Sequence, residues 1–224
     1  MVGRQVEIDM LAAKLDEALA GRGQIVGISA EAGMGKSRLV AEFARTVEPR
    51  GITIAVGECQ SFGRNTSYLV WNAIWSVLFR LDSRLAEDEQ VRSLEAELAA
   101  IDPALVPRAP LLGGPSRLAH SDNDLTASFD AKLRKTSLEG LLVDCLRALA
   151  SKGPILLVLE DCYWIDPLSR ELLEVLGRGL AGVSVLLVLA YRPDKDVGSS
   201  LGVENLPHFE EIGLTELEGR TRCS

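Results

Sequence analysis

The stretch that most constrains the fold is residues 24–40, which read QIVGISAEAGMGKSRLV. An apolar, β-branched run at 25–28 predicts a buried parallel strand, and a loop of small residues follows it. Gly35, Lys36 and Ser37 then open an amphipathic helix that is expected to end near Thr46. Small residues let backbone N–H groups point at a polyphosphate, a lysine reaches its terminal oxygens, and a hydroxyl can hold magnesium. The pattern therefore predicts a phosphate-binding loop with Lys36 and Ser37 in the last two roles.

The loop departs from the full GxxxxGK(S/T) pattern at its first position, where Ala30 replaces glycine. Alanine restricts positive φ but removes no hydrogen-bond donor, and Gly33 and Gly35 remain. The alternative is an ordinary strand-to-helix turn with a coincidental Lys-Ser pair. The strand and helix that flank the loop favour the phosphate-binding interpretation.

Composition limits the classes of protein to which the chain can belong. With 224 residues, 47% of them apolar, it can bury one substantial core, or a main domain with a small appendage. Its formal charge of -8 argues against nucleic-acid binding over a broad basic surface, although it does not exclude a local basic patch. No stretch approaches the roughly twenty apolar residues of a membrane span, and the N-terminus lacks a secretory apolar segment.

The four cysteines show no CxxC spacing and lie mostly in apolar surroundings. We expect reduced core thiols rather than zinc ligands or a disulfide framework, and hence a cytoplasmic protein. These residues are Cys59, Cys145, Cys162 and Cys223.

The remaining periodicity predicts alternating strands and helices. An amphipathic helix over 6–20 precedes the loop strand, and residues 52–57 form a second buried strand. A strand, a helix and a second strand imply a right-handed crossover and a parallel sheet. Further strands are expected over 154–161, 183–189 and 209–214.

The region at about 68–150 is predicted to be a helical insertion between the second and third strands. It holds an aromatic stripe that is more typical of a core than of a ligand site. A charged helix, a proline-rich connection and a long apolar helix follow it, over 84–100, 102–115 and 125–149. The stripe consists of Tyr68, Trp71, Trp75 and Phe79.

Two polar features in this insertion have alternative interpretations. Asp122, Asn123 and Asp124 are expected to cap the next helix, although an acidic trio also admits a metal site. His120 is isolated among polar residues and is interpreted as a surface histidine rather than a ligand.

The strand at 154–161, PILLVLED, ends in two carboxylates. Buried parallel strands deliver their C-terminal residues to the crevice where ligands bind. One carboxylate can hold magnesium while its neighbour polarises an attacking water. We expect Asp161 to be catalytic and Glu160 to hold the metal together with Ser37, although the two roles could be exchanged. The alternative is an acidic pair that merely caps a strand.

Asp166 and Arg192, which both follow this strand in the sequence, are expected to have different roles. Asp166 precedes Pro167 and is predicted to be a helix N-cap rather than a catalytic or metal-binding residue. Arg192 follows the strand at 183–189 and could sense a γ-phosphate through charge-assisted hydrogen bonds. A solvated strand-end arginine is the competing interpretation.

Four ordered motifs together carry a resemblance to a known family. They are Val2-Gly3-Arg4 with Glu7, AEAGMGKSRLVAEF, LLVLEDCYWIDPLSRELL and LLVLAYRPD. The chain from Val2 to about Leu217 resembles the signal-transduction ATPases with numerous domains (STAND), which are related to AAA+ and Orc-like P-loop ATPases. QSFGRNTSYLVWNAIW and FDAKLRKTSLEGLLVDCLRALA further resemble the ATPase module of large bacterial proteins. There the module lies between a class III adenylate or guanylate cyclase domain and tetratricopeptide repeats, and related modules occur in large transcription regulators.

The resemblance implies an α/β P-loop NTPase fold. It would be a three-layer αβα sandwich whose five-stranded parallel sheet has the phosphate-loop strand at its centre. One ATPase domain is expected over 1–217, followed by a short and apparently truncated tail over 218–224.

The resemblance also implies a site for ATP or ADP with Mg²⁺. Val2, Gly3 and Arg4 would lie near the adenine or ribose, and Arg192 would be the sensor. The loop residues expected to bind nucleotide are Ala32, Gly33, Met34, Gly35, Lys36, Ser37 and Arg38.

Three departures from the family pattern bear on hydrolysis more than on binding. Ala30 replaces the first glycine, and Glu160 stands where aspartate is frequent. Cys162-Tyr163 stands where leucine-histidine is common before Trp164.

The leading functional hypothesis is an ATP-binding, slowly hydrolysing, Mg-dependent switch module of a bacterial regulatory protein. Its expected partners are nucleotide and output domains of the same longer polypeptide, with no membrane. Alternatives are a nucleotide-binding module without appreciable turnover and an Orc-like DNA-dependent ATPase. Acidity and the lack of a winged-helix segment count against DNA binding, and no metal-binding cyclase core can be placed in these residues.

Overall fold

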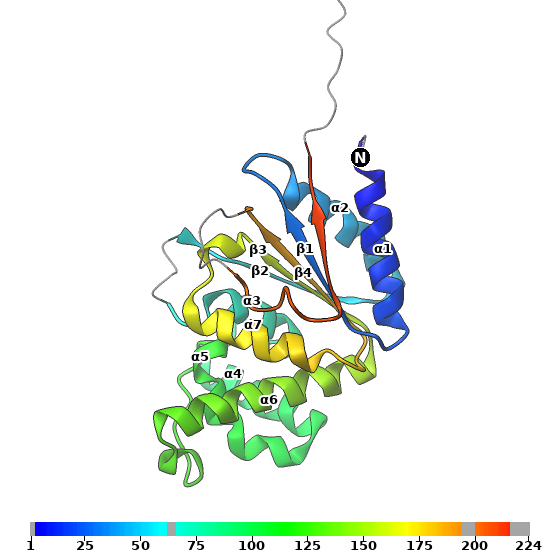
Figure 1. The fold of residues 1–224 in the computed structure, drawn as a ribbon. Coiled ribbons are helices and arrows are strands. Elements are labelled where there is room, and N and C mark those ends of the chain that lie inside the picture. Colours follow the sequence, from blue (N-terminus) through cyan, green and yellow to red (C-terminus); the bar gives the residue numbers. More distant parts are fainter. Residues whose placement is uncertain (1–2, 62–65, 194–199, 216–224) are drawn as a thin grey trace, which may run out of the picture.

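A single parallel sheet separates two groups of helices (Figure 1). The computed structural model describes residues 3–61, 66–193 and 200–215. Its strands lie in the order β2-β3-β4-β1-β5, and every neighbouring pair is parallel. The strands are β1 (Gln24–Ser29), β2 (Thr53–Glu58), β3 (Ile155–Glu160), β4 (Val185–Tyr191) and β5 (Phe209–Gly213).

The predicted fold class, an α/β sandwich around five parallel strands, is confirmed. One detail needs refinement, because β1 was expected at the centre. β1 is an interior strand that pairs with both β4 and β5, but β4 holds the middle position. All six residues of β1 are buried, as expected for a strand covered on both faces.

Each face of the sheet carries its own apolar cluster. Helices α1 (Gln5–Leu19) and α2 (Lys36–Val47) cover one face, whereas α3 (Leu69–Leu78) and α7 (Pro167–Gly179) cover the other (Figure 1). Side chains alternate between the two clusters along β3: Val158 packs on the α1–α2 side and Leu157 on the α3–α7 side. This alternation decides which strand-end residues face the phosphate loop.

The predicted helical insertion lies between β2 and β3. Its long helix begins later than predicted, because the Asp130 carboxylate accepts the Leu133 N–H at 2.7 Å and caps it there. The proline-rich segment expected to be a connection is instead a 3₁₀ helix. After α3 the insertion comprises α4 (Glu87–Ile101), η3 (Pro103–Leu112), α5 (Gly113–Ser116), η4 (Thr126–Ser128) and α6 (Ala131–Lys152).

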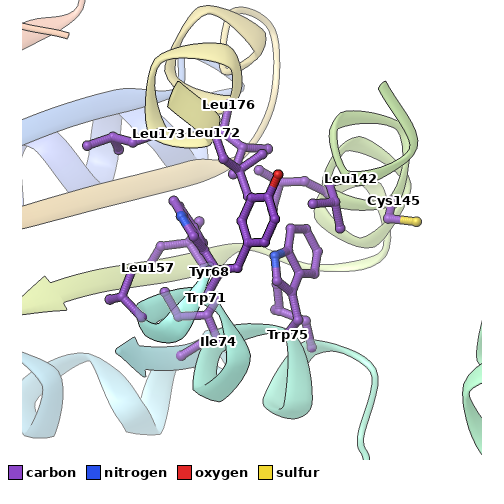
Figure 2. Close-up of a cluster of buried hydrophobic side chains, with 14 of the residues drawn as sticks. Tyr68, Trp71, Ile74, Trp75, Leu142, Cys145, Leu157, Leu172, Leu173 and Leu176 are labelled. Carbon is purple, nitrogen blue, oxygen red and sulfur yellow. The ribbon is translucent and has the colours of Figure 1, made fainter. Parts of the chain in front are cut away.

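The aromatic stripe forms core, as predicted. Trp71 and Trp75 are 0% and 1% exposed, and Trp75 stacks on Phe79 at a centroid distance of 5.3 Å. Figure 2 shows Tyr68, Trp71 and Trp75 of the stripe in one cluster with Leu142 of α6 and Leu172 of α7. These contacts attach the insertion to the sheet domain through one continuous apolar cluster.

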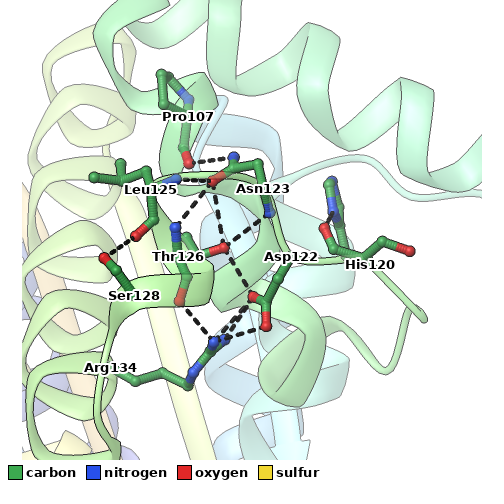
Figure 3. A network of polar contacts seen from close by, with 9 residues as sticks. Pro107, His120, Asp122, Asn123, Leu125, Thr126, Ser128 and Arg134 are labelled. Carbon is green, nitrogen blue, oxygen red and sulfur yellow. Dashed lines mark hydrogen bonds and ion pairs between the residues drawn. The ribbon is translucent and has the colours of Figure 1, made fainter.

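Asp122 and Asn123, the first two residues of the acidic trio, stabilise a turn (Figure 3). Asp122 pairs with Arg134 at 2.8 Å and accepts the Thr126 hydroxyl, while the Asn123 side chain accepts the N–H groups of Leu125 and Thr126. Within the described ranges no group of three or more metal-binding side chains occurs. The trio therefore does not cap the long helix as predicted, because Asp130 caps that helix. η4 has no side-chain cap from its own N-cap residue, Leu125, and Asn123 stabilises the turn that leads into it.

Other isolated polar residues have structural partners. His120 is not simply a surface residue, because its side chain is mostly covered and its ring nitrogen contacts Glu95 at 3.1 Å. Asp166 caps α7 as predicted: its carboxylate accepts the N–H groups of Ser169 and Tyr68.

The described cysteines are free and buried, as predicted. Cys223 lies outside the described residues, as do the predicted domain end at 217 and the tail over 218–224. Among the helices described, none has the length and apolar character needed to span a membrane.

Candidate functional site

The phosphate loop joins β1 to α2 through backbone conformations that require glycine. Gly33 and Gly35 have φ values of 80° and 88°, in the left-handed region that residues other than glycine rarely adopt. Ala30 is not among the described residues with positive φ, so the alanine at that position imposes no backbone strain. The departure from the glycine pattern therefore leaves the loop geometry intact.

The first turn of α2 presents unpaired donors to the loop. Among the described residues, the N–H groups of Lys36, Ser37 and Arg38 have no backbone acceptor, and no side chain caps this helix. Ser37 and Arg38 are exposed. Free N–H groups at the positive end of a helix dipole form a cradle for an anion such as a phosphate.

Lys36 is held inside the loop by the loop's own carbonyls. It is 8% exposed, and its ammonium donates to the carbonyl oxygens of Ala30 at 2.6 Å and Glu31 at 3.1 Å. Burial lowers the pKa of Lys36, the carboxylate of Asp161 opposes that shift, and the charge of Arg192 reinforces it. Asp161 and Arg192 therefore act electrostatically on the same ammonium, although they come from different strands.

The two carboxylates after β3 differ in backbone conformation. Glu160 is the half-buried last residue of the strand, and alternation places it on the same face as Val158 and α2. Asp161 lies beyond the strand, with φ at 51°, and begins the short turn Cys162–Trp164. The strand expected over 154–161 therefore ends one residue early, at Glu160. Because Asp161 has a left-handed backbone, strand alternation does not determine the direction of its side chain.

Arg192 follows β4 directly and is exposed. Its guanidinium carbon lies 5.8 Å from the centroid of the Tyr163 ring, within the range of a cation–π interaction. The Tyr163 ring in turn meets Trp164 edge to face at a centroid distance of 4.8 Å. This contact was not predicted from the sequence, where Tyr163 stands out only as a departure from the family pattern.

The N-terminal signature lies beside the phosphate loop. Arg4 is 5% exposed and donates to the Glu7 carboxylate at 2.7 Å and to the Thr215 carbonyl at 2.6 Å. A longer hydrogen bond of 3.4 Å reaches the carbonyl of Met34 in the loop. Arg4 thus links the start of α1 to the loop and to the segment after β5. Gly3 precedes it with φ at 92°, and Val2 lies outside the described residues.

A cavity of about 270 Å³ lies at the carboxyl ends of β1, β4 and β5. Ser29 and Tyr191, which are register partners on neighbouring strands, line it together with Arg192. The Tyr191 hydroxyl donates to Glu211 at 2.9 Å. Burial is the main cause that raises the pKa of Tyr191, and the hydrogen bond to the Glu211 carboxylate raises it further. The cavity was not predicted from the sequence, where its only signal is that several of these residues end or follow predicted strands.

The structure therefore joins some of the predicted site residues and leaves others apart. Lys36, Asp161 and Arg192 share one electrostatic environment, and Ser37 and Arg38 lie at the adjoining helix start. Ala32 is exposed and Met34 half-buried in the loop. Glu160 lies at the end of β3, but among the described residues no hydrogen bond or ion pair joins it to Lys36 or Ser37.

Comparison with known sequences gives one family match and one distant relative. The AAA ATPase domain family model matches residues 1–188. An uncharacterized protein of Rhizobium meliloti (strain 1021) is 29% identical over 195 residues. That match covers 86% of this chain but only 18% of the relative's length.

Solved structures with a similar arrangement are remote. The Orc1 protein of Aeropyrum pernix in complex with DNA has 16% identity and a TM-score of 0.49, over 96% of this chain and 46% of that one. Drosophila ORC bound to DNA has 12% identity and a TM-score of 0.39, over 95% and 94% of the two chains.

Proposed function

Because this chain belongs to the AAA ATPase domain family, we propose that it binds ATP with Mg²⁺ and acts as a slowly hydrolysing switch. One observation carries the proposal: a buried lysine, in a loop with unpaired N–H donors, shares its electrostatic environment with Asp161 and Arg192. A cation beside free donors suits a polyphosphate, and a nearby carboxylate suits proton transfer.

The loop residues suit a triphosphate and its metal. The N–H groups at the start of α2 would bind the phosphate oxygens, and Lys36 would exchange its contacts with Ala30 and Glu31 for the terminal oxygens. The Ser37 hydroxyl and the Glu160 carboxylate are oxygen ligands of the kind that Mg²⁺ prefers. When bound, Mg²⁺ would neutralise charge on the phosphates and help to fix their position.

Asp161 and Arg192 would act on the reacting end of the nucleotide. Asp161 would orient an attacking water and accept its proton, with the roles of Glu160 and Asp161 open to exchange. Arg192 would donate charge-assisted hydrogen bonds to the γ-phosphate and so distinguish ATP from ADP. In this proposal Arg4 and Gly3, with Val2, adjoin the base or ribose.

We further propose that the module works inside a longer cytoplasmic regulatory polypeptide. The Rhizobium meliloti relative supports this, because the matched region occupies only 18% of its length. Cyclase or transcription-regulator output domains and tetratricopeptide repeats are the proposed partners, on the motif resemblance alone. The formal charge of -8 gives no support to a DNA-dependent ATPase.

Phosphate release from Mg-ATP by the purified protein tests the hydrolytic part of this proposal. We expect slow release by the wild type and a loss of at least about tenfold in Lys36→Ala and Asp161→Asn. Lys132→Ala and Asp124→Asn are matched controls, because both side chains are exposed and lie in the insertion. Both controls should release phosphate at the wild-type rate.

The same assay separates a switch from a binding module. If the wild type binds ATP yet releases phosphate no faster than the two site variants, the protein holds nucleotide without turnover. The hydrolytic proposal would then be wrong, while the nucleotide-binding proposal would stand.

A further inference from the structure

Tyr163 and Arg192 are far apart in the sequence but contact each other at one edge of the sheet. β3 and β4 are neighbouring parallel strands, and each of these residues follows the end of its own strand. The guanidinium carbon lies 5.8 Å from the ring centroid. Both residues also line the 270 Å³ cavity.

The Tyr163 ring is not part of the buried core. It is 40% exposed, in contrast to the buried aromatic residues of α3. Trp164 supports it edge to face, which fixes the orientation of the ring and leaves Arg192 within reach of its face. A partly exposed ring of this kind is a suitable platform for a cation.

Arg192 lies beside the start of the phosphate loop as well as over this ring. The carbonyl of Tyr191, the residue before it, accepts the N–H of Ala30 at 3.3 Å, and Arg192 lines the cavity together with Ser29 at the end of β1. The ring therefore keeps Arg192 near the phosphate site before any nucleotide binds. An arginine without such support would sample many rotamers and would lose that freedom on binding.

We propose that Tyr163 is a positioning residue that preorganises Arg192 for the γ-phosphate. The inference rests on the proposed nucleotide-binding function and adds a residue to it. Tyr163 contacts the sensor arginine rather than the nucleotide, and its effect falls on the affinity for ATP relative to ADP. ADP has no γ-phosphate, so its binding gains nothing from a preordered guanidinium.

The ring face, and not the tyrosine hydroxyl, makes the described contact with the cation. Phenylalanine keeps that face, whereas leucine removes it and leaves an apolar side chain. The energy of a partly exposed cation–π contact corresponds to about a two- to fivefold change in affinity. The aromatic and aliphatic variants should therefore differ by that factor.

Calorimetric titration with a non-hydrolysable Mg-ATP analogue and with Mg-ADP tests the inference. The proteins are wild type, Tyr163→Phe, Tyr163→Leu, Arg192→Ala and the double variant Tyr163→Leu/Arg192→Ala. We expect Tyr163→Phe to keep the wild-type ratio of ATP to ADP affinity. Tyr163→Leu should lower that ratio about two- to fivefold. Once Arg192 is alanine, Tyr163→Leu should change the ratio no further.

Two results would overturn the positioning role. One is an unchanged affinity ratio in Tyr163→Leu, and the other is an equal decrease with and without Arg192. Far-ultraviolet circular dichroism and thermal unfolding of each variant exclude a general loss of folding. A wild type that binds neither nucleotide would instead refute the proposed function itself, and the two failures are therefore distinguishable.

Discussion

At the scale of single residues, the conformation of the phosphate loop depends on Gly33 and Gly35 and not on a glycine at position 30. A Cβ at Gly35 would meet no atom within 4 Å, so any cost of substitution there comes from φ alone. Ala30, by contrast, is buried and has no positive φ. The two positions should therefore respond in opposite ways to exchange of glycine and alanine.

We predict that Gly35→Ala destabilises the protein by about 1–2 kcal/mol and weakens Mg-ATP binding, because the loop must leave its left-handed conformation. Ala30→Gly restores the full glycine pattern but should lower stability by about 0.5–1 kcal/mol without raising ATP affinity. Urea unfolding and calorimetric titration measure both quantities. Stronger ATP binding by Ala30→Gly would show that the alanine does impair the loop.

Cys145 gives a pH dependence at the same scale. Burial raises the pKa of its thiol to about 12, from an ordinary value of 9.0. Below pH 9 the thiol is neutral in both the folded and unfolded states, and its contribution to stability is complete. Between pH 9 and 12 only the unfolded thiol ionises, so the free energy of unfolding falls by about 1.4 kcal/mol per pH unit.

Comparison of wild type with Cys145→Ala isolates this effect, because alanine does not titrate and all other groups cancel. The difference in the free energy of unfolding between the two proteins should stay constant up to pH 9. Above that pH the free energy of unfolding of the wild type should fall relative to that of Cys145→Ala. Urea titrations at several pH values measure it, and parallel pH profiles would contradict a buried, neutral thiol.

At the scale of elements, the helical insertion depends on a close approach between β2 and α3. A Cβ at Gly57 would lie 2.2 Å from the Val70 carbonyl oxygen and 2.8 Å from a methyl carbon of the same residue. The strand and the helix could not remain in their observed contact. A glycine in an open part of α6, Gly140, offers a matched control, because a Cβ there meets nothing within 4 Å.

Gly57→Ala should destabilise the protein by about 1–3 kcal/mol, because extra atoms in a tight contact force backbone shifts. Gly140→Ala should stabilise it by about 0.5–1 kcal/mol through helix propensity. Thermal and urea unfolding of the two variants measure the contrast. Equal stabilities would mean that the insertion is not packed against β2 as described.

At the scale of the whole molecule, much of the fold followed from periodicity and connection rules. The buried runs predicted five strands, the first strand–helix–strand crossover predicted a parallel sheet, and the motif resemblance implied that this sheet has five strands. The helical and proline-rich segments between the second and third strands predicted the insertion. The order of the strands in the sheet did not follow from periodicity, because local sequence pattern does not determine which strand occupies the middle of a sheet. The start of α6 was also missed, because Asp130 competes with the upstream apolar pattern and caps the helix.

The candidate site was predictable where a motif is contiguous and not where it depends on strand neighbours. Lys36 and Ser37 follow from the loop sequence alone. The contact of Tyr163 with Arg192 and the cavity near Ser29 both arise because β4 lies between β3 and β1. The left-handed backbone of Asp161 was not predicted, although aspartate is one of the few residues other than glycine that adopt this conformation.

Calorimetric titration of Mg-ATP into wild type, Lys36→Ala and Lys132→Ala decides whether the chain binds nucleotide through its phosphate loop. We expect saturable binding at one site by the wild type and by Lys132→Ala, which replaces an exposed lysine of α6. Lys36→Ala should bind at least about tenfold more weakly, because a charge-assisted contact to phosphate is lost. Absence of binding by the folded wild type, or equal affinity in all three proteins, would contradict nucleotide binding through this loop.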